Sequence, residues 1–141
     1  MPIKFHPGVG QVLYCDFDAG GFQPPEMVKS RPVIVLSRSN KSDICTVVPL
    51  SGTVPNPVLP HHHKINPDSL PQRVADKGEW WVKGDMIATV GFFRLDRVKE
   101  GRNHHGKRQY STKKVSKADL LAVKMCVIHA LCMNDLTSGQ Q

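Results

Sequence analysis

The sequence predicts a mainly β fold that ends in a C-terminal helix, and three observations carry this prediction. Short β-branched runs alternate with turn residues up to about position 98, a pattern typical of a small antiparallel barrel. A basic, hydrophilic stretch follows. Residues 116–135 then place apolar side chains at helical spacing behind a capping serine. With 141 residues, the chain is long enough for one domain with a sizeable core.

The expected strands are short apolar runs bounded by glycine, proline or charged residues. They cover residues 10–17, 31–37, 44–49, 79–82 and 86–90, with residues 64–65 as a further short candidate. Three segments between them lack such runs. Residues 18–30 hold two glycines and two prolines and predict a functional loop. Residues 38–43 predict a polar turn, and residues 52–78 predict an irregular excursion.

The C-terminal part predicts a connector and a helix. Residues 99–115 are basic and are expected to be exposed. Ser116 begins the helix, with Asp119 at the third helical position in a capping-box arrangement. Apolar residues after it cover more than one helical face, which predicts burial against the barrel and against a second subunit.

The charge balance favours a polyanionic partner. The chain has 19 lysine and arginine residues against 12 aspartate and glutamate residues, a formal net charge of +7. RNA, DNA, an acidic protein and an anionic membrane surface all satisfy this balance. No apolar stretch reaches the roughly 18 residues of a membrane span, and the first residues lack the apolar core of a signal peptide. We therefore expect a cytoplasmic protein that does not enter a membrane.

Cysteines and histidines give no sign of a cofactor. Four cysteines lie in apolar segments without a Cys-x-x-Cys pair, which predicts reduced, packed thiols and no zinc site. The run His61-His62-His63 predicts an exposed polar loop rather than a metal site, because successive side chains point in different directions. The same alternation places one of Trp80 and Trp81 in the core and the other near the surface.

Four segments of the chain occur in an order that carries a family resemblance. They are Gly10-Gln-Val-Leu-Tyr-Cys-Asp-Phe-Asp18, Ser30-Arg31-Pro32-Val-Ile-Val-Leu-Ser37, Val48-Pro49-Leu50-Ser51, and Gly84-Asp85 with Thr89 four residues later. Together with the helix after Ser116, they resemble the MazF/PemK (Kid) toxin family over roughly residues 8–98 and the helix. The Arg-Pro strand is the most specific of these segments.

The resemblance implies one MazF/PemK-like domain over residues 1–141. Its fold is a small SH3-like antiparallel barrel of the MazF/PemK/CcdB type at residues 8–98, with a connector at 99–115 and a helix at 116–135. It also implies a homodimer and a sequence-selective, metal-independent endoribonuclease. Such an enzyme cleaves single-stranded RNA by 2′-OH attack, leaving 2′,3′-cyclic phosphate and 5′-hydroxyl ends. An acidic, partly disordered antitoxin holds such toxins inactive, and would suit the positive charge.

Metal-free RNA cleavage needs a base, a cation beside the phosphate and an acid. The resemblance implies that Arg31 and Ser51 act at the scissile phosphate and that Asp85 takes part in proton transfer. If the strands with Arg31 and Ser51 are neighbours, a guanidinium and a hydroxyl reach a common sheet edge and can hold a phosphate. The residues expected to bind RNA are Gln23, Lys29, Ser30, Lys83 and Thr89.

Two departures from Kid-like members leave alternatives open. Lys83 stands where that branch has an arginine, and lysine lacks the bidentate geometry of a guanidinium. Phe22 and Gln23 stand where that branch has a loop histidine. A non-catalytic barrel of the same fold therefore remains an alternative. It would bind a protein target, as CcdB toxins bind gyrase, or bind RNA without cleaving it.

Structural roles for the site residues also remain open. Arg31 could form a surface ion pair, Ser51 could be an ordinary hydroxyl at a strand end, and Asp85 could be a turn residue. A DNA-binding protein is disfavoured, because no helix-turn-helix pattern precedes the long helix.

Overall fold

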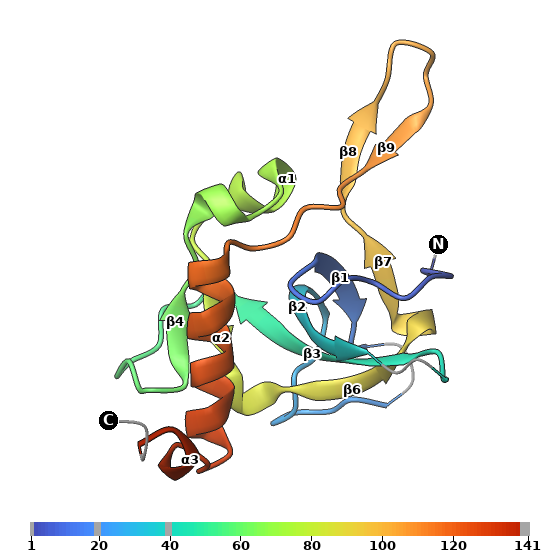
Figure 1. The fold of residues 1–141 in the computed structure, drawn as a ribbon. Coiled ribbons are helices and arrows are strands. Elements are labelled where there is room, and N and C mark those ends of the chain that lie inside the picture. The colour runs from blue at the N-terminus through green and yellow to red at the C-terminus, as the bar shows by residue number, and fades with distance from the viewer. Residues whose placement is uncertain (1, 19–20, 39–40, 139–141) are drawn as a thin grey trace.

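The structure, a computed structural model, describes residues 2–18, 21–38 and 41–138 (Figure 1). The strands are β1 Val12–Asp16, β2 Ser30–Arg38, β3 Ile44–Ser51, β4 His62–Lys64, β5 Trp81–Lys83, β6 Ala88–Gly91, β7 Leu95–Arg97, β8 Lys99–Arg102 and β9 Arg108–Tyr110. The α-helices are α1 Gln72–Ala75, α2 Lys117–Ala130 and α3 Asp135–Ser138. Three 3₁₀ turns are η1 Pro67–Ser69, η2 Gly84–Met86 and η3 Phe92–Arg94.

The main sheet is antiparallel and has the order β4-β5-β3-β2-β1-β7. β6 pairs with the first half of β3, and β5 pairs with its last two residues, so η2 spans the gap between them. The mainly β fold with a C-terminal helix is confirmed, but the sheet is not closed into a barrel. Within the described ranges no ladder joins β4 to β7, and both of these outer strands are only three residues long.

The sheet separates two hydrophobic cores, because neighbouring residues of a strand point to opposite faces. Val33 and Val35 of β2 enter the first core, whereas Ile34 and Leu36 contact the second. The first core contains Ile3, Leu13, Cys15, Phe17, Met27, Val33, Val35, Cys45, Val47, Val90, Phe92 and Leu95. The second contains Val12, Ile34, Val48, Leu50, Ile65, Leu70, Val74, Val82, Val98, Val115, Val123 and Cys126.

The helix α2 covers the second core and begins where the sequence predicted. The Ser116 hydroxyl accepts a hydrogen bond from the Asp119 N–H at 3.1 Å. Val123 and Cys126 are buried. The helix ends at residue 130 rather than 135, because Cys132 adopts a left-handed conformation with φ of 58°. α3 then follows as a separate turn.

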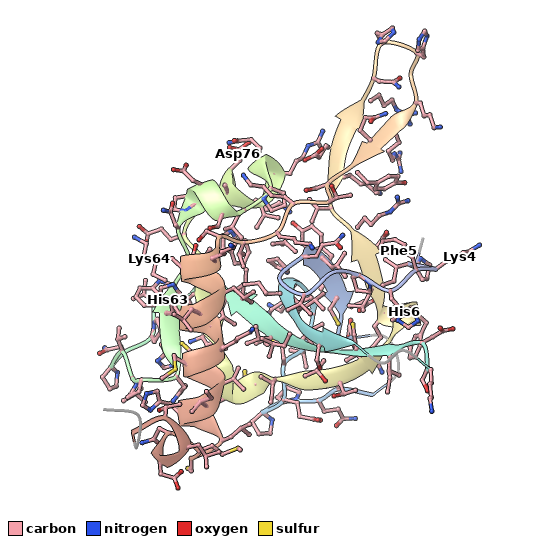
Figure 2. All side chains as sticks on the ribbon, viewed as in Figure 1. Lys4, Phe5, His6, His63, Lys64 and Asp76 are labelled. Atoms are coloured by element: carbon pink, nitrogen blue, oxygen red, sulfur yellow. The ribbon has the colours of Figure 1, made fainter. Side chains whose placement is uncertain are left out.

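The excursion at residues 52–78 is more ordered than predicted, because Asp119 of α2 binds it at several points. Its carboxylate accepts hydrogen bonds from His63 Nε2 at 2.9 Å, Ser69 Oγ at 2.5 Å and the Asn66 N–H at 3.3 Å. Figure 2 shows His63 beside α2. Burial alone would raise the pKa of Asp119, but these hydrogen bonds outweigh burial and lower it.

The predicted connector at residues 99–115 is mostly exposed, and its first part forms the hairpin β8–β9, which the sequence did not indicate. Figure 1 shows this hairpin projecting away from the main sheet. The Asn103 side chain accepts hydrogen bonds from the N–H groups of His105 and Lys107 at 2.9 and 3.0 Å. Gly106 has φ of 77° and completes the turn. The sequence did not indicate this turn, because its residues stand in a polar stretch without the apolar alternation typical of strands.

Other expectations on local structure had mixed outcomes. Residues 19–20 of the predicted loop and residues 39–40 of the predicted turn lie outside the described residues. Three cysteines are buried as expected, whereas Cys132 is exposed. Trp80 and Trp81 are both partly buried, and the Trp80 indole N–H donates to the Val74 carbonyl at 2.8 Å. Across the described ranges, every helix is too short or too polar to span a bilayer.

Candidate active site

Arg31 and Ser51 lie at the same end and on the same face of two neighbouring strands. The β2–β3 ladder pairs Val33 with Pro49, and continuing this register by two residues brings Arg31 opposite Ser51. Both positions fall on the face of the first core, because they alternate with Val33 and Pro49. The expected neighbourhood of the two strands is therefore present, and it directs a guanidinium and a hydroxyl toward one sheet edge.

Local contacts orient both side chains. Arg31 is partly buried, and its Nε donates to the Val28 carbonyl at 3.3 Å. Ser51 is only 6% exposed, and its Oγ accepts a hydrogen bond from the Thr53 N–H at 3.1 Å. Its own hydroxyl proton remains available for a second interaction.

A hollow of about 450 Å³ lies on this face of the sheet. We call it the loop hollow, and it is lined by Phe17, Phe22, Pro25, Glu26, Met27, Asp85, Met86, Ile87 and Ala88. Its walls are the loop before β2 and the η2 turn, and Asp85 is exposed. The third predicted catalytic residue therefore lies on the same face as the first two, although Arg31 and Ser51 do not line the hollow itself.

Glu26 is a carboxylate of the loop hollow that sequence reasoning missed. Its Oε1 accepts a hydrogen bond from the Gln23 N–H at 3.2 Å, and both residues are exposed. The sequence gives one signal for it, a carboxylate within a loop already expected to be functional. No motif distinguished it from the other polar residues of that loop.

Two histidines of the excursion approach Asp85. His61 Nε2 lies 3.6 Å from Asp85 Oδ2. His62 pairs with Lys83 across the β4–β5 ladder, which places this lysine beside the histidines. Burial, then the charges of His61 and Lys83, lower the pKa of His62 against the opposing effect of Asp85. The expected exposed histidine loop is wrong, since residues 62 and 63 lie in a strand and all three histidines are partly buried.

The other predicted RNA-binding residues are not gathered at one place. Gln23 and Lys29 are exposed, and Lys29 has φ of 72°. Ser30 faces the opposite side of the sheet from Arg31. Thr89 hydrogen-bonds Thr46 at 2.6 Å, five residues along β3 from Ser51. At about 3.3 Å per residue, that is roughly 16 Å from the Arg31 edge.

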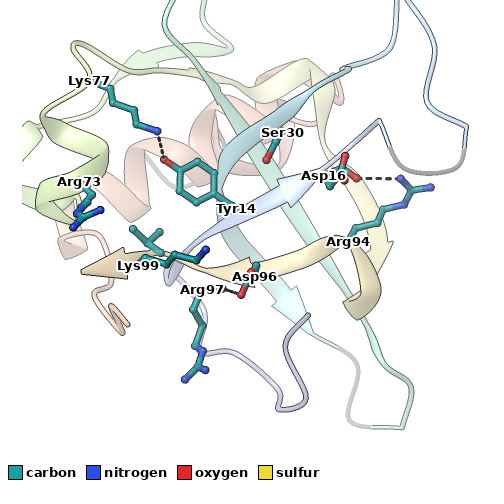
Figure 3. A pocket seen from close by; sticks show the side chains of 10 residues that line it. Tyr14, Asp16, Ser30, Arg73, Lys77, Arg94, Asp96, Arg97 and Lys99 are labelled. Atoms are coloured by element: carbon teal, nitrogen blue, oxygen red, sulfur yellow. Dashed lines mark hydrogen bonds between the residues drawn. The ribbon is translucent and has the colours of Figure 1, made fainter. Parts of the chain in front are cut away.

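A second cavity, of about 520 Å³, lies on the face to which Ser30 points (Figure 3). We call it the cation cavity, and its basic residues are Arg73, Lys77, Arg94, Arg97 and Lys99. Two aspartates, Asp16 and Asp96, also line it. Lys77 Nζ donates a hydrogen bond to the Tyr14 hydroxyl at 3.1 Å. The Cζ atom of the Arg97 guanidinium lies 3.9 Å from the centroid of the Tyr110 ring. Its basic residues are scattered in sequence, so no single basic run predicted this cluster.

Comparison with known proteins identifies the family. The family described as PemK-like, MazF-like toxin of type II toxin-antitoxin system matches residues 9–131. The uncharacterized protein YifN of Escherichia coli K12 is 32% identical over 121 residues, covering 74% of this chain and 81% of that protein. An uncharacterized protein of Haemophilus influenzae is 33% identical over 106 residues, covering 67% of this chain and 73% of that protein.

Solved structures share the fold. An endoribonuclease from Mycobacterial species, in complex with its cognate antitoxin, superposes with a TM-score of 0.59 at 19% identity, over 90% of this chain and 96% of that chain. MazF from Deinococcus radiodurans superposes with a TM-score of 0.62 at 13% identity, over 92% of this chain and 100% of that chain. The family match spans most of the sequence, as the resemblance of its motifs predicted. The chain therefore belongs to the PemK-like, MazF-like toxins of type II toxin–antitoxin systems.

Proposed function

We propose that this protein is a sequence-selective endoribonuclease that cleaves single-stranded RNA without a metal ion. The observation that carries the proposal is the β2–β3 register, which, continued two residues beyond the Val33–Pro49 pair, brings Arg31 and Ser51 to one end and one face of the two strands. A phosphate at this edge meets a guanidinium fork and a hydroxyl together. The fold shared with an endoribonuclease and with MazF supports the same reaction class.

In the proposed reaction, a carboxylate removes the proton from a ribose 2′-OH, and the oxygen attacks the adjacent phosphorus. Asp85 and Glu26 both line the loop hollow and are the candidates for this base. Arg31 stabilises the dianionic phosphorane, with Ser51 as a further hydrogen-bond partner. The protonated carboxyl group, directly or through water, returns a proton to the departing 5′-oxygen as the P–O5′ bond breaks and the 2′,3′-cyclic phosphate forms.

The cation cavity supports a path for the RNA beyond the cleavage point. Ser30 and Arg31 are adjacent and face opposite sides of the sheet, so RNA that crosses the start of β2 can reach both faces. Arg73, Lys77 and Arg97 are then in place for flanking phosphates, and the Tyr110 ring under Arg97 adds a stacking surface.

Two protein partners complete the proposal. An acidic antitoxin in the cytoplasm would bind the basic surface and cover the Arg31 edge, as the net charge of +7 favours. A second copy of the chain would cover the apolar side chains at the end of α2 and on α3. Leu131, Met133 and Leu136 are exposed there.

The test incubates purified protein with a long single-stranded RNA in EDTA and maps the new ends. Discrete cuts with 5′-hydroxyl and 2′,3′-cyclic phosphate ends are expected. Arg31→Ala should slow cleavage by about a hundredfold or more. Lys124→Ala, which removes one exposed positive charge from α2, should cleave as the parent does.

Each outcome has a separate meaning. Intact RNA that shifts in mobility with the parent protein would overturn cleavage and favour RNA binding alone. Intact RNA without a shift would favour a protein target. If cleavage occurs, separate Asp85→Asn and Glu26→Gln variants identify the base, because only loss of the base removes the rising limb of the pH–rate profile.

A further inference from the structure

We propose that His61, His62 and Asp85 form a binding site for a zinc-class divalent ion, and that the bound ion inhibits RNA cleavage. The inhibitory half rests on the proposed function, whereas the binding half does not. Among the described residues, these three offer one donor atom each, all within 4.8 Å of one another. They come from two segments about twenty residues apart that the β4–β5 pairing brings together.

The donor geometry is close to what such an ion needs. Zinc takes nitrogen and carboxylate donors at about 2.0–2.2 Å, which sets tetrahedral donors roughly 3.3–3.5 Å apart. His61 Nε2 and Asp85 Oδ2 are already 3.6 Å apart. The rings of His61 and His62 lie side by side with centroids 4.2 Å apart. Rotation of the exposed Asp85 side chain and the two rings closes the remaining gap.

The backbone beneath these side chains is fixed. The Gly84 N–H donates to the His61 carbonyl at 3.0 Å, which ties the η2 turn to the start of β4. His62 is held by its register with Lys83. Gly84 has no side chain, and a Cβ there would lie 2.8 Å from the His61 oxygen. The two segments can approach this closely only because position 84 is glycine, so the backbone that carries the donors is preorganised.

The donor types of this cluster also suit a metal ion. Neutral imidazole is the commonest metal ligand in proteins, and His62 supplies one of the two imidazole rings of this cluster. Its Nδ1 now accepts a hydrogen bond from the Leu59 N–H at 3.0 Å. Leu59 is exposed, so this bond can open when the ring turns toward the ion. Two imidazoles and one carboxylate suit zinc better than magnesium or calcium, which prefer oxygen donors.

Binding would withdraw Asp85 from RNA chemistry. The Asp85 carboxylate lines the loop hollow and is a candidate base there. The charge of a bound dication stabilises the ionised carboxylate and makes it a weaker base, so Asp85 accepts a proton less readily. Lys83 opposes the ion through its positive charge, which predicts that Lys83→Gln binds zinc more tightly than the parent.

The binding test titrates tag-free protein with Zn²⁺ against a chromogenic chelator. One ion per chain is expected at this site. His61→Ala and His62→Ala should each weaken it by at least about tenfold, the effect typical even of residues that only orient a ligand. The matched control is His104→Ala/His105→Ala, which removes an adjacent histidine pair with centroids 3.9 Å apart at the tip of the hairpin. This control and Cys132→Ser should bind zinc as the parent does.

Thermal unfolding without metal checks that each variant is folded. Equal zinc affinity in the parent and the His61 and His62 variants would overturn the site. Loss of zinc only in the hairpin or Cys132 variants would also overturn it.

Cleavage assays then test inhibition. Micromolar Zn²⁺ should slow RNA cleavage by the parent protein, and excess EDTA should restore the rate. His62→Ala should need at least about tenfold more zinc for the same inhibition. If zinc binds as expected but the parent protein does not cleave RNA even in the absence of zinc, the proposed function fails and the binding site stands. If zinc speeds cleavage, inhibition is wrong.

Discussion

The Asp119 carboxylate is the residue that joins the excursion to the C-terminal helix. It is buried, and it accepts hydrogen bonds from a side chain of β4, a side chain of η1 and a backbone N–H between them. A buried charge is tolerated only when such partners replace water. Replacing Asp119 should therefore lower the free energy of unfolding by more than replacing an ordinary surface aspartate does.

We expect Asp119→Asn to lower the free energy of unfolding by about 1–3 kcal/mol near pH 7, because at least one donor loses its partner. The effect should depend on pH. Folding lowers the pKa of Asp119, so the ionised form contributes its full stability above the ordinary carboxyl pKa. That contribution is lost as pH falls through the lower, folded-state pKa. The free energies of unfolding of Asp119→Asn and the parent protein should therefore converge in acid.

Urea unfolding between pH 3 and pH 7 measures this difference. Asp68→Asn, on the exposed part of η1, is the matched control and should change stability little. A constant gap between Asp119→Asn and the parent across this range would contradict the assigned ionisation.

At the level of elements, η2 depends on a close backbone approach. A Cβ at Gly84 would lie 2.8 Å from the His61 oxygen and 2.9 Å from the Cys126 carbonyl atoms. Backbone atoms on both sides leave no flexible side chain to move away. We expect Gly84→Ala to destabilise the protein by about 1–3 kcal/mol and to displace Asp85.

Gly52→Ala tests the same substitution where space exists, since the nearest atom to a Cβ there is the Glu79 oxygen at 4.0 Å. Thermal unfolding of both variants measures the contrast. Equal midpoints for the two variants would show that α2 and β4 do not constrain this turn.

The exposed end of the helical region makes a prediction about assembly. Leu131 and Leu136 are 51% and 64% exposed at the end of α2 and on α3. We expect Leu131→Asp/Leu136→Asp to convert the proposed dimer to a monomer, because charges at a buried interface are costly. Light scattering of parent and variant measures the mass. Phe93→Asp, at an apolar residue 66% exposed on η3, should leave the mass unchanged.

Some elements could be predicted from sequence because their signals are local. The β-branched runs of β2 and β3 and the Ser116 cap specify structure within a few neighbouring residues. The hairpin β8–β9 was missed, because its turn residues are embedded in a polar stretch without apolar alternation. The helix end was misplaced, because a left-handed Cys132 has no sequence signal comparable to glycine.

The candidate site was predictable only in part for a related reason. Arg31, Ser51 and Asp85 stand in motifs, and the shared face of Arg31 and Ser51 follows from strand alternation. Glu26 and His61 reach the same region through a loop and an excursion whose paths depend on long-range contacts. Sequence spacing carries no information about such contacts, so neither residue could be placed beforehand.

At the level of the whole molecule, the net charge of +7 should make the affinity for RNA depend strongly on salt. In an Arg31→Ala background, where the proposed cleavage is expected to be at least about a hundredfold slower, the affinity for RNA should fall steeply as salt rises. Removing two phosphate contacts with Lys77→Gln/Arg97→Gln should reduce the slope of log affinity against log salt by roughly 1.4, at about 0.7 per contact for single strands.

Fluorescence anisotropy with a labelled RNA across 50–300 mM salt, roughly the range where such slopes are measured, provides this comparison. Lys117→Gln/Lys124→Gln removes the same charge from exposed positions of α2 and should leave the slope close to that of the parent. Equal slopes for all three proteins would exclude the cation cavity from the RNA path.

The packing of α2 against the η2 turn also bears on when activity begins. Translation runs from the N-terminus, so Arg31 and Ser51 emerge before the helix whose Cys126 backbone abuts Gly84. Until that helix docks, the Asp85 turn lacks its packing against α2, although the Gly84 N–H bond to the His61 carbonyl already ties the turn to β4. We therefore expect the proposed nuclease activity of a nascent chain to begin only after α2 has been synthesised and has docked against the η2 turn.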